Sequence, residues 1–324
     1  MSARLSEFQL VQPARIEDAI AAFVAKPGAR YVAGGTDLLV NMRRGIVSAD
    51  RLIDLSGVAG WGSIDADAEG MTIGAGVTIA ALARDPIVIS RYPAVAQAAT
   101  SIAGPGHRNV ATVGGNLCLD TRCIYYNQSE WWRKSNDYCL KNRGDTCHVA
   151  PQGKRCHAAF SGDLAPVFLA LGASAEIAGV DGRRRVPLSD LYVEDGRAHL
   201  SLKPGELVAS VHLPAVLAAC AYEKVRARGA IDYPLAGVAV ALMIAGGKIV
   251  MLRIALTGTN SRPFLLADVD QFIGKSVDDA MLHGVDRLVQ RQVQPMRTTL
   301  AAAHYRRLAA AAVARRVVRR LAGA

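Results

Sequence analysis

Two glycine pairs could bind a phosphate group. Gly34-Gly35 is followed by Thr36-Asp37, and Gly114-Gly115 is followed by Asn116 about 80 residues later. Because glycine has no Cβ, backbone N–H groups there can approach a phosphate oxygen, and the start of a following helix adds favourable partial charge. Neither pair belongs to a G-x-G-x-x-G or a P-loop pattern. The sequence therefore predicts two loops that hold one pyrophosphate from two sides, outside the Rossmann and P-loop folds.

Four of the six cysteines fall within 34 residues and could hold a metal centre. They are separated by 15, 7 and 8 residues, and they are Cys123, Cys139, Cys147 and Cys156. Four thiolates suit either a tetrahedral zinc ion or a [4Fe–4S] cluster. The spacing does not choose between these metals, because it contains no C-x-x-C pair, and free thiols remain a third interpretation. Cys118 and Cys220 lie outside this group and are interpreted as packing thiols.

Short elements surround these residues. Helical periodicity is expected over residues 15–25, 36–44, 91–103 and 163–172, and the chain is again helical from about residue 265. Residues 174–215 alternate as short strands, and three longer strand-like runs follow at 219–228, 236–245 and 249–257. We expect one domain over residues 1–215, with subdomains of about 1–57 and 58–215, and a second over 216–324. Residues 120–158, which contain the four clustered cysteines, differ in composition and are interpreted as an insertion.

The composition is that of a folded, water-soluble protein. The chain has 324 residues, of which 51% are hydrophobic and 20% charged, and no long uninterrupted apolar run predicts a membrane helix. The first ten residues lack the apolar region of a secretory signal, so a cytoplasmic location is expected. The net charge is +10, but nine arginines and no acidic residue follow Asp286. This basic end indicates a solvated helix face or a docking face for an acidic subunit, rather than a nucleic-acid site.

Longer stretches around the glycine pairs resemble a known family. Residues 30–45, 106–118 and 161–173, with 222–240 and 253–266, are similar to the FAD-binding subunit of the xanthine oxidase, or molybdenum hydroxylase, family. The resemblance implies an α+β fold, with a vanillyl-alcohol-oxidase-type FAD-binding domain followed by an antiparallel sheet with helices. It covers nearly the whole chain outside 120–158.

The resemblance also implies which residues bind FAD. The first loop would wrap the pyrophosphate, Asp163 would lie near the adenosine end, and Lys224 near the flavin. Ile102 stands where relatives place an aromatic ring against the flavin, and Val208 would give an apolar contact. The full implied set is Val32, Ala33, Gly34, Gly35, Thr36, Asp37, Ile102, Thr112, Gly114, Gly115, Asn116, Asp163, Val208 and Lys224.

The insertion resembles one that holds a [4Fe–4S] cluster in a member of this family. That resemblance implies a redox role for Cys123, Cys139, Cys147 and Cys156, since zinc carries no electrons. It further implies a large molybdopterin subunit, a small subunit with two [2Fe–2S] clusters, a heterohexameric assembly and ferredoxin as electron donor, with no catalytic residue on this chain. Two alternatives stay open: the flavin subunit of a carbon monoxide, aldehyde or purine dehydrogenase, and a zinc-stabilised flavin-binding scaffold without a redox role.

Overall fold

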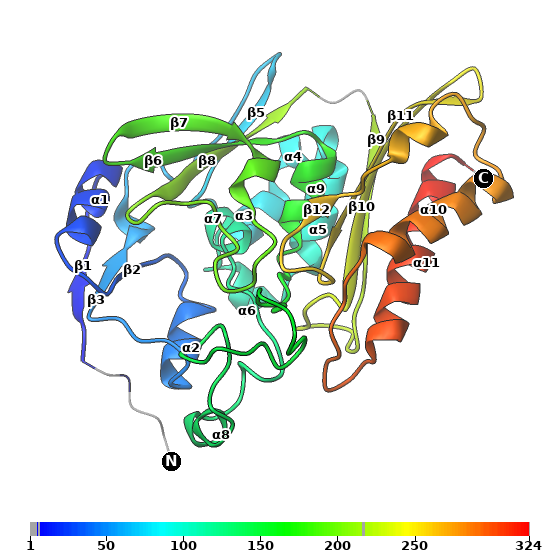
Figure 1. Ribbon diagram of the computed structural model, residues 1–324. Helices are drawn as coiled ribbons and strands as arrows, with labels where there is room; N and C mark the ends of the chain where they lie inside the picture. The colour runs from blue at the N-terminus through cyan, green and yellow to red at the C-terminus, as the bar shows by residue number, and fades with distance from the viewer. Residues whose placement is uncertain (1–4, 6, 216–217, 324) are drawn as a thin grey trace.

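The structure is a computed structural model that describes residues 5, 7–215 and 218–323. The expected domain boundary at 215/216 lies next to residues 216–217, which are outside the described residues. Part of the N-terminal segment considered for a secretory signal is also outside them. Three sheets with helices around them make up the described chain (Figure 1). The expected α+β architecture with a C-terminal antiparallel sheet is therefore confirmed.

A small parallel sheet carries the first glycine pair. Its strand order is β1-β3-β2, with β1 at Gln9–Val11, β2 at Ala29–Val32 and β3 at Arg51–Asp54. Helix α1 (Ile16–Val24) connects β1 to β2, and α2 (Leu38–Arg43) connects β2 to β3. The first glycine pair is in the turn from β2 into α2. This crossover presents the turn at the carboxyl end of a parallel strand, where open α/β sheets bind ligands.

The second sheet is antiparallel and has five strands in the order β4-β5-β8-β6-β7. Helices below it in Figure 1 contribute the second glycine pair, which lies in α7. The strands are β4 (Ile64–Ala66), β5 (Gly70–Gly74), β6 (Ser174–Gly179), β7 (Gly182–Pro187) and β8 (Leu207–Pro214). The helices of this region are α3 (Ile79–Arg84), α4 (Pro86–Arg91), α5 (Pro93–Ser101), α6 (Pro105–Arg108), α7 (Val113–Leu117) and α9 (Leu164–Ala170).

The third sheet is antiparallel and buried on both faces. Its strands are β9 (Ala219–Val225), β10 (Ala236–Ala245), β11 (Lys248–Thr257) and β12 (Phe264–Leu265), and Gly246-Gly247 makes the tight β10–β11 turn with both φ angles positive. Along β10, Ala239 and Ala241 pack into the core formed with the first two sheets, while Val238 and Val240 face α10 (Asp279–Gln292) and α11 (Ala303–Leu321). Small alanines on the inner face allow the sheet to approach the first core closely.

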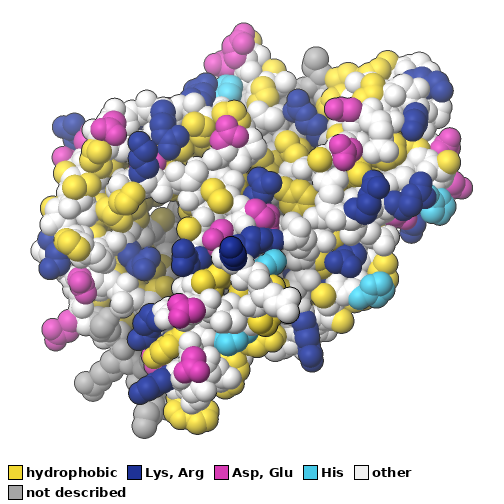
Figure 2. Space-filling view, viewed as in Figure 1, with side chains coloured by type: hydrophobic (Ala, Val, Ile, Leu, Met, Phe, Trp, Pro, Cys, Tyr) yellow, Lys and Arg dark blue, Asp and Glu magenta, His cyan; other side chains and the backbone are white. Residues whose placement is uncertain are grey.

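The basic C-terminal helix is paired with acidic side chains of its own chain. Val313 and Val317 of α11 are fully buried, as the helical spacing predicts. On its polar side, Arg319 lies 2.8 Å from Asp279, and Arg316 and Arg320 both pair with Glu223. Arg306 is 2% exposed and donates to the carbonyls of Leu235, Met296 and Gly258. Figure 2 shows basic and acidic side chains interspersed over one face of the molecule. Much of the expected basic surface is therefore internally neutralised.

Candidate functional site: a flavin pocket beside a cysteine insertion

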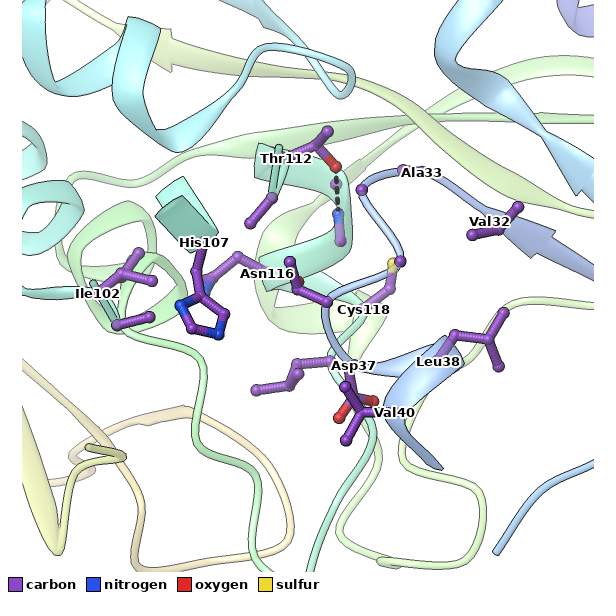
Figure 3. Close-up of a pocket in the computed structure, with 18 of the residues that line it drawn as sticks. Val32, Ala33, Asp37, Leu38, Val40, Ile102, His107, Thr112, Asn116 and Cys118 are labelled. Atoms are coloured by element: carbon purple, nitrogen blue, oxygen red, sulfur yellow. Dashed lines mark hydrogen bonds between the residues drawn. The ribbon is translucent and has the colours of Figure 1, made fainter. Parts of the chain in front are cut away.

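A cavity of about 550 Å³ lies between the two glycine loops. Thirteen of the fourteen residues expected to bind FAD line it; Lys224 does not. Figure 3 shows Val32, Ala33 and Asp37 on one side, Thr112 and Asn116 on another, and Ile102 and His107 on a third. Residues distant in the sequence thus line one cavity, which both glycine loops border.

The first glycine loop presents unused hydrogen-bond donors. Within the described part of the chain, no carbonyl or side chain accepts from the backbone N–H groups of residues 34–37. Gly35 has a φ of +67°, which favours glycine, and a Cβ on Gly34 would lie 2.0 Å from the Val110 carbonyl oxygen. Both glycines are therefore required for the shape of the loop. The resulting N–H groups suit the oxygens of a pyrophosphate.

The second loop has a different role from the one that the sequence predicts. Thr112 caps α7 and accepts a hydrogen bond from the Gly115 N–H at 3.1 Å, while the Gly114 N–H donates to the Ala75 carbonyl. A Cβ on Gly114 would lie 2.8 Å from the Cβ of Ala75, whereas a Cβ on Gly115 would contact only Thr112. The donors of these two glycines are thus satisfied internally. This loop supplies space and surface to the pocket rather than free glycine N–H groups.

Asp163 and Lys224 form a buried ion pair. The Lys224 Nζ lies 2.9 Å from Asp163 Oδ1, with exposed side-chain fractions of 3% and 5%, and Tyr222 donates a 2.6 Å hydrogen bond to the same oxygen. Burial raises the pKa of Asp163, and Lys224 and Tyr222 oppose that rise. The resemblance implied that these two residues serve opposite ends of FAD. Their direct contact shows that they do not lie far apart, and only Asp163 lines the cavity.

Sequence reasoning missed the loop between β9 and β10. Arg228, Ile231, Asp232 and Tyr233 of this loop line the cavity, so the third sheet contributes to the pocket. Asp232 fixes the loop by accepting from the backbone N–H groups of residues 227 and 228 at 3.0 Å. No phosphate-binding motif marks this segment. Its sequence signals are its position after Lys224 and its place within the stretch 222–240 that resembles the family, and neither indicates contact with the cavity.

The four clustered cysteines lie together in the insertion. All are buried, with exposed fractions of 4–8%, and every cysteine in the described chain is a free thiol. Backbone N–H groups donate to sulfur: Tyr126 to Cys123 at 3.3 Å, and Ala158 to Cys156 at 3.4 Å. The Cys156 thiol donates a hydrogen bond to the Cys147 sulfur. This bond, with nearby backbone N–H groups, lowers the pKa of Cys147 to about 4. The same bond, with burial, raises the pKa of Cys156.

The arrangement of the four thiols bears on which metal centre they could hold. Among the residues that the structure describes, no three His, Cys, Asp or Glu side chains converge as ligands of a single ion. This finding weakens the zinc interpretation, because structural zinc needs four converging donors. A [4Fe–4S] cluster instead takes one thiolate for each of four irons. The four cysteines supply that number of thiolates, and backbone N–H groups donate to two of the sulfur atoms.

Charged side chains anchor the insertion to the rest of the protein. Lys141, with 4% of its side chain exposed, lies 2.7 Å from Asp120 and donates to the Gly196 carbonyl. Arg133, which follows Glu130 in α8 (Glu130–Ser135), donates to the Gly45 carbonyl at 2.8 Å. Figure 1 shows α8 and its flanking loops beneath α2. The insertion therefore packs against the helix that follows the first glycine loop.

Sequence comparisons identify the family. Residues 6–216 match the FAD binding domain in molybdopterin dehydrogenase, and residues 220–321 match the CO dehydrogenase flavoprotein C-terminal domain. The chain therefore belongs to the FAD-binding subunits of the CO dehydrogenase and xanthine oxidase family. The expected family and its FAD binding are confirmed.

Individual relatives agree with this assignment. The FAD-binding subunit of an aldehyde oxidoreductase from Escherichia coli is 34% identical over 75% of this chain and 79% of its own. The carbon monoxide dehydrogenase medium chain of Afipia carboxidovorans is 27% identical over 97% of this chain and 96% of its own. The structure of reconstituted CO dehydrogenase from Oligotropha carboxidovorans has the same fold, with a TM-score of 0.82, 24% identity and 99% coverage of both chains. No helix in the described chain is long and apolar enough to span a membrane.

Proposed function

We propose that this chain is the electron-transfer subunit of a molybdenum hydroxylase and binds FAD between its two glycine loops. The observation that carries the proposal is the cavity itself, which joins thirteen expected cofactor residues from three parts of the chain. FAD, when bound, links one-electron and two-electron transfer. The substrate would bind to a molybdopterin-containing large subunit, and a small subunit with [2Fe–2S] clusters would complete the assembly.

The protein's own residues would hold and shield the cofactor. The first loop offers N–H donors to the pyrophosphate, and Gly114 and Gly115 of the second loop leave room in the opposite wall, between the side chains of Thr112 and Asn116. Asp163, which the buried ion pair with Lys224 holds in place, is a fixed polar group in the pocket wall. Val208, which is 3% exposed, and Ile102, at 7%, supply apolar surface that excludes water. These features bind and orient a flavin, and none of them requires a substrate site on this chain.

The comparisons favour the flavin subunit of a carbon monoxide, aldehyde or purine dehydrogenase. The relatives described above are subunits of an aldehyde oxidoreductase and of carbon monoxide dehydrogenases, and a putative xanthine dehydrogenase subunit of E. coli is 29% identical over 75% of this chain. Under this proposal, the four cysteines would have a structural role.

The cysteine insertion favours a second candidate, 4-hydroxybenzoyl-CoA reductase. In that enzyme class, the ring hydroxyl group is removed reductively to give benzoyl-CoA, and ferredoxin would supply the electrons. A β subunit of this type would carry a [4Fe–4S] cluster on Cys123, Cys139, Cys147 and Cys156. The supporting observation is that these four thiols are buried together with N–H donors to sulfur.

Metal analysis of the purified chain separates the two candidates. The second candidate predicts about four irons with acid-labile sulfide per chain, and an electron paramagnetic resonance signal after dithionite reduction. Serine at any of the four clustered cysteines should remove this iron, while Cys220→Ser, outside the insertion, should leave it. Iron-free protein, or iron retained in all four serine variants, would contradict the cluster assignment. FAD content, measured in the same samples, tests the first proposal separately, because none of these cysteines lines the cavity.

A further inference from the structure

An acidic side chain lies at the FAD pyrophosphate cradle. Asp37 lines the cavity at the end of the first glycine loop, immediately before α2, and Figure 3 shows its carboxylate at the edge of the pocket. The Asn41 side chain donates to its Oδ1 at 2.8 Å, which fixes its orientation without neutralising its charge. A bound pyrophosphate is also negatively charged. An unpaired carboxylate at this position would therefore repel the cofactor.

One cation pairs with Asp37, and it comes from the cysteine insertion. The Arg122 Nη2 lies 3.2 Å from Asp37 Oδ2 and 3.4 Å from Asp120, with 17% of the side chain exposed. The guanidinium also lies over the Tyr126 ring, 5.4 Å from its centre. The Arg122 backbone is held by two 2.9 Å hydrogen bonds with Ala159. This arginine therefore has a fixed position between the insertion and the first loop.

We propose that Arg122 is a positioning residue for FAD. It does not line the cavity, so it acts through Asp37: it neutralises the carboxylate and holds the turn before α2 in place. Its position directly before Cys123 joins the FAD site to the cysteine insertion. The affinity of the protein for FAD thus depends on a residue outside both glycine loops. This proposal concerns FAD binding alone and is independent of which metal, if any, the insertion holds.

The test measures the FAD dissociation constant of flavin-stripped protein by fluorescence quenching. Arg122→Met keeps much of the apolar side-chain length and removes the charge, and we expect FAD binding to weaken at least tenfold. Arg122→Lys keeps a cation and should bind more tightly than Arg122→Met. Asp37→Asn, introduced into the Arg122→Met protein, should restore most of the lost affinity, because it removes the unpaired carboxylate. A purely structural role for Arg122 would not produce this rescue.

Arg44→Met is the matched control. Like Arg122, Arg44 joins α2 to the insertion, through a 2.6 Å hydrogen bond to the Asn127 carbonyl, and does not line the cavity, but among the described residues it forms no ion pair with Asp37. Its substitution should change FAD affinity less than twofold. Where circular dichroism shows Arg122→Met to be unfolded, Arg122→Gln takes its place with the same expectations. Wild-type affinity in the charge-removing Arg122 variant, or no rescue by Asp37→Asn, would overturn the proposal.

Discussion

Loss of Lys224 should strongly destabilise the region around the FAD pocket. Its ammonium group lies 2.9 Å from Asp163 with almost no solvent around either side chain. Lys224→Met leaves the Asp163 carboxylate buried with only the Tyr222 hydroxyl and more distant charges to oppose the cost of burial. Breaking a buried ion pair on one side costs about 3–5 kcal/mol. For a domain of about 200 residues, this corresponds to a fall in Tm of roughly 6–20 °C.

The loss of stability should depend on pH in a defined direction. Burial already raises the pKa of Asp163, and removing Lys224 removes the largest opposing effect, so the pKa rises further. At a pH between the pKa of an unfolded Asp, about 3.9, and the raised pKa in the folded protein, the folded protein binds a proton at Asp163 that the unfolded protein does not. Stability contributed by this group therefore falls as pH rises through that interval. The difference between Lys224→Met and wild type should be smaller near pH 4 than at neutral pH.

Thermal unfolding of flavin-stripped protein across this pH range is the assay. Lys248→Met is a matched control, because Lys248 is an exposed strand lysine whose hydrogen bond is to Ser276; its effect should stay within about 0.5 kcal/mol. Asp163→Asn in the Lys224→Met protein should recover part of the lost Tm by removing the unpaired charge. A Lys224→Met protein as stable as the Lys248→Met control, or a Tm deficit that grows toward acid pH, would refute the reasoning.

Three further outcomes are expected. Gly115→Val should reduce the amount of FAD bound to folded protein, because the new side chain enters the cavity with only Thr112 nearby. Gly106→Val, at an exposed position, should leave FAD binding unchanged. Equal flavin absorbance in both variants would contradict this prediction. Gly34→Val should yield little folded protein by circular dichroism, since its Cβ would overlap the Val110 carbonyl. The arginines after Asp286 should give only weak DNA binding that salt abolishes, and a tight, sequence-selective complex in gel-shift assays at physiological salt would disprove this.

Local sequence patterns were sufficient for much of the fold. The β10–β11 hairpin follows from two strand-like runs around Gly246-Gly247, because a two-residue turn with positive φ needs little tertiary support. The turn into α2 and the cap of α7 are also local features, so the glycine pairs could be placed correctly. Helix α9 was predicted from an apolar run at 163–172, which the structure buries completely over Leu164–Ala170.

The features of the site that the sequence did not predict depend on contacts between distant segments. Nothing within the segment 228–233 indicates that it reaches the cavity, because it does so only when the third sheet packs on the FAD-binding domain. The ion pair of Lys224 with Asp163 joins residues 61 positions apart, and no periodicity encodes it. The internal hydrogen bonds of Gly114 and Gly115 likewise need Ala75 and Thr112 in place. Sequence similarity to the family supplied Asp163, Lys224 and the second glycine pair but not their arrangement, and it supplied neither segment 228–233 nor Ala75 as part of the site.

The same reasoning explains why the insertion should not be treated as an independent module. It begins after the second glycine loop, yet its charged side chains contact the first loop's helix: Arg122 reaches Asp37 and Arg133 reaches Gly45. Each of these contacts joins residues more than 80 positions apart. Each one also restricts a long side chain, so the hydrogen bond or ion pair must offset the lost conformational entropy. An insertion that merely protected four thiols would need no contact with the flavin cradle. Its position against α2 puts Arg122 beside the flavin cradle, and the Arg122 and Asp37 variants test whether this contact affects FAD binding without reference to the metal content of the protein.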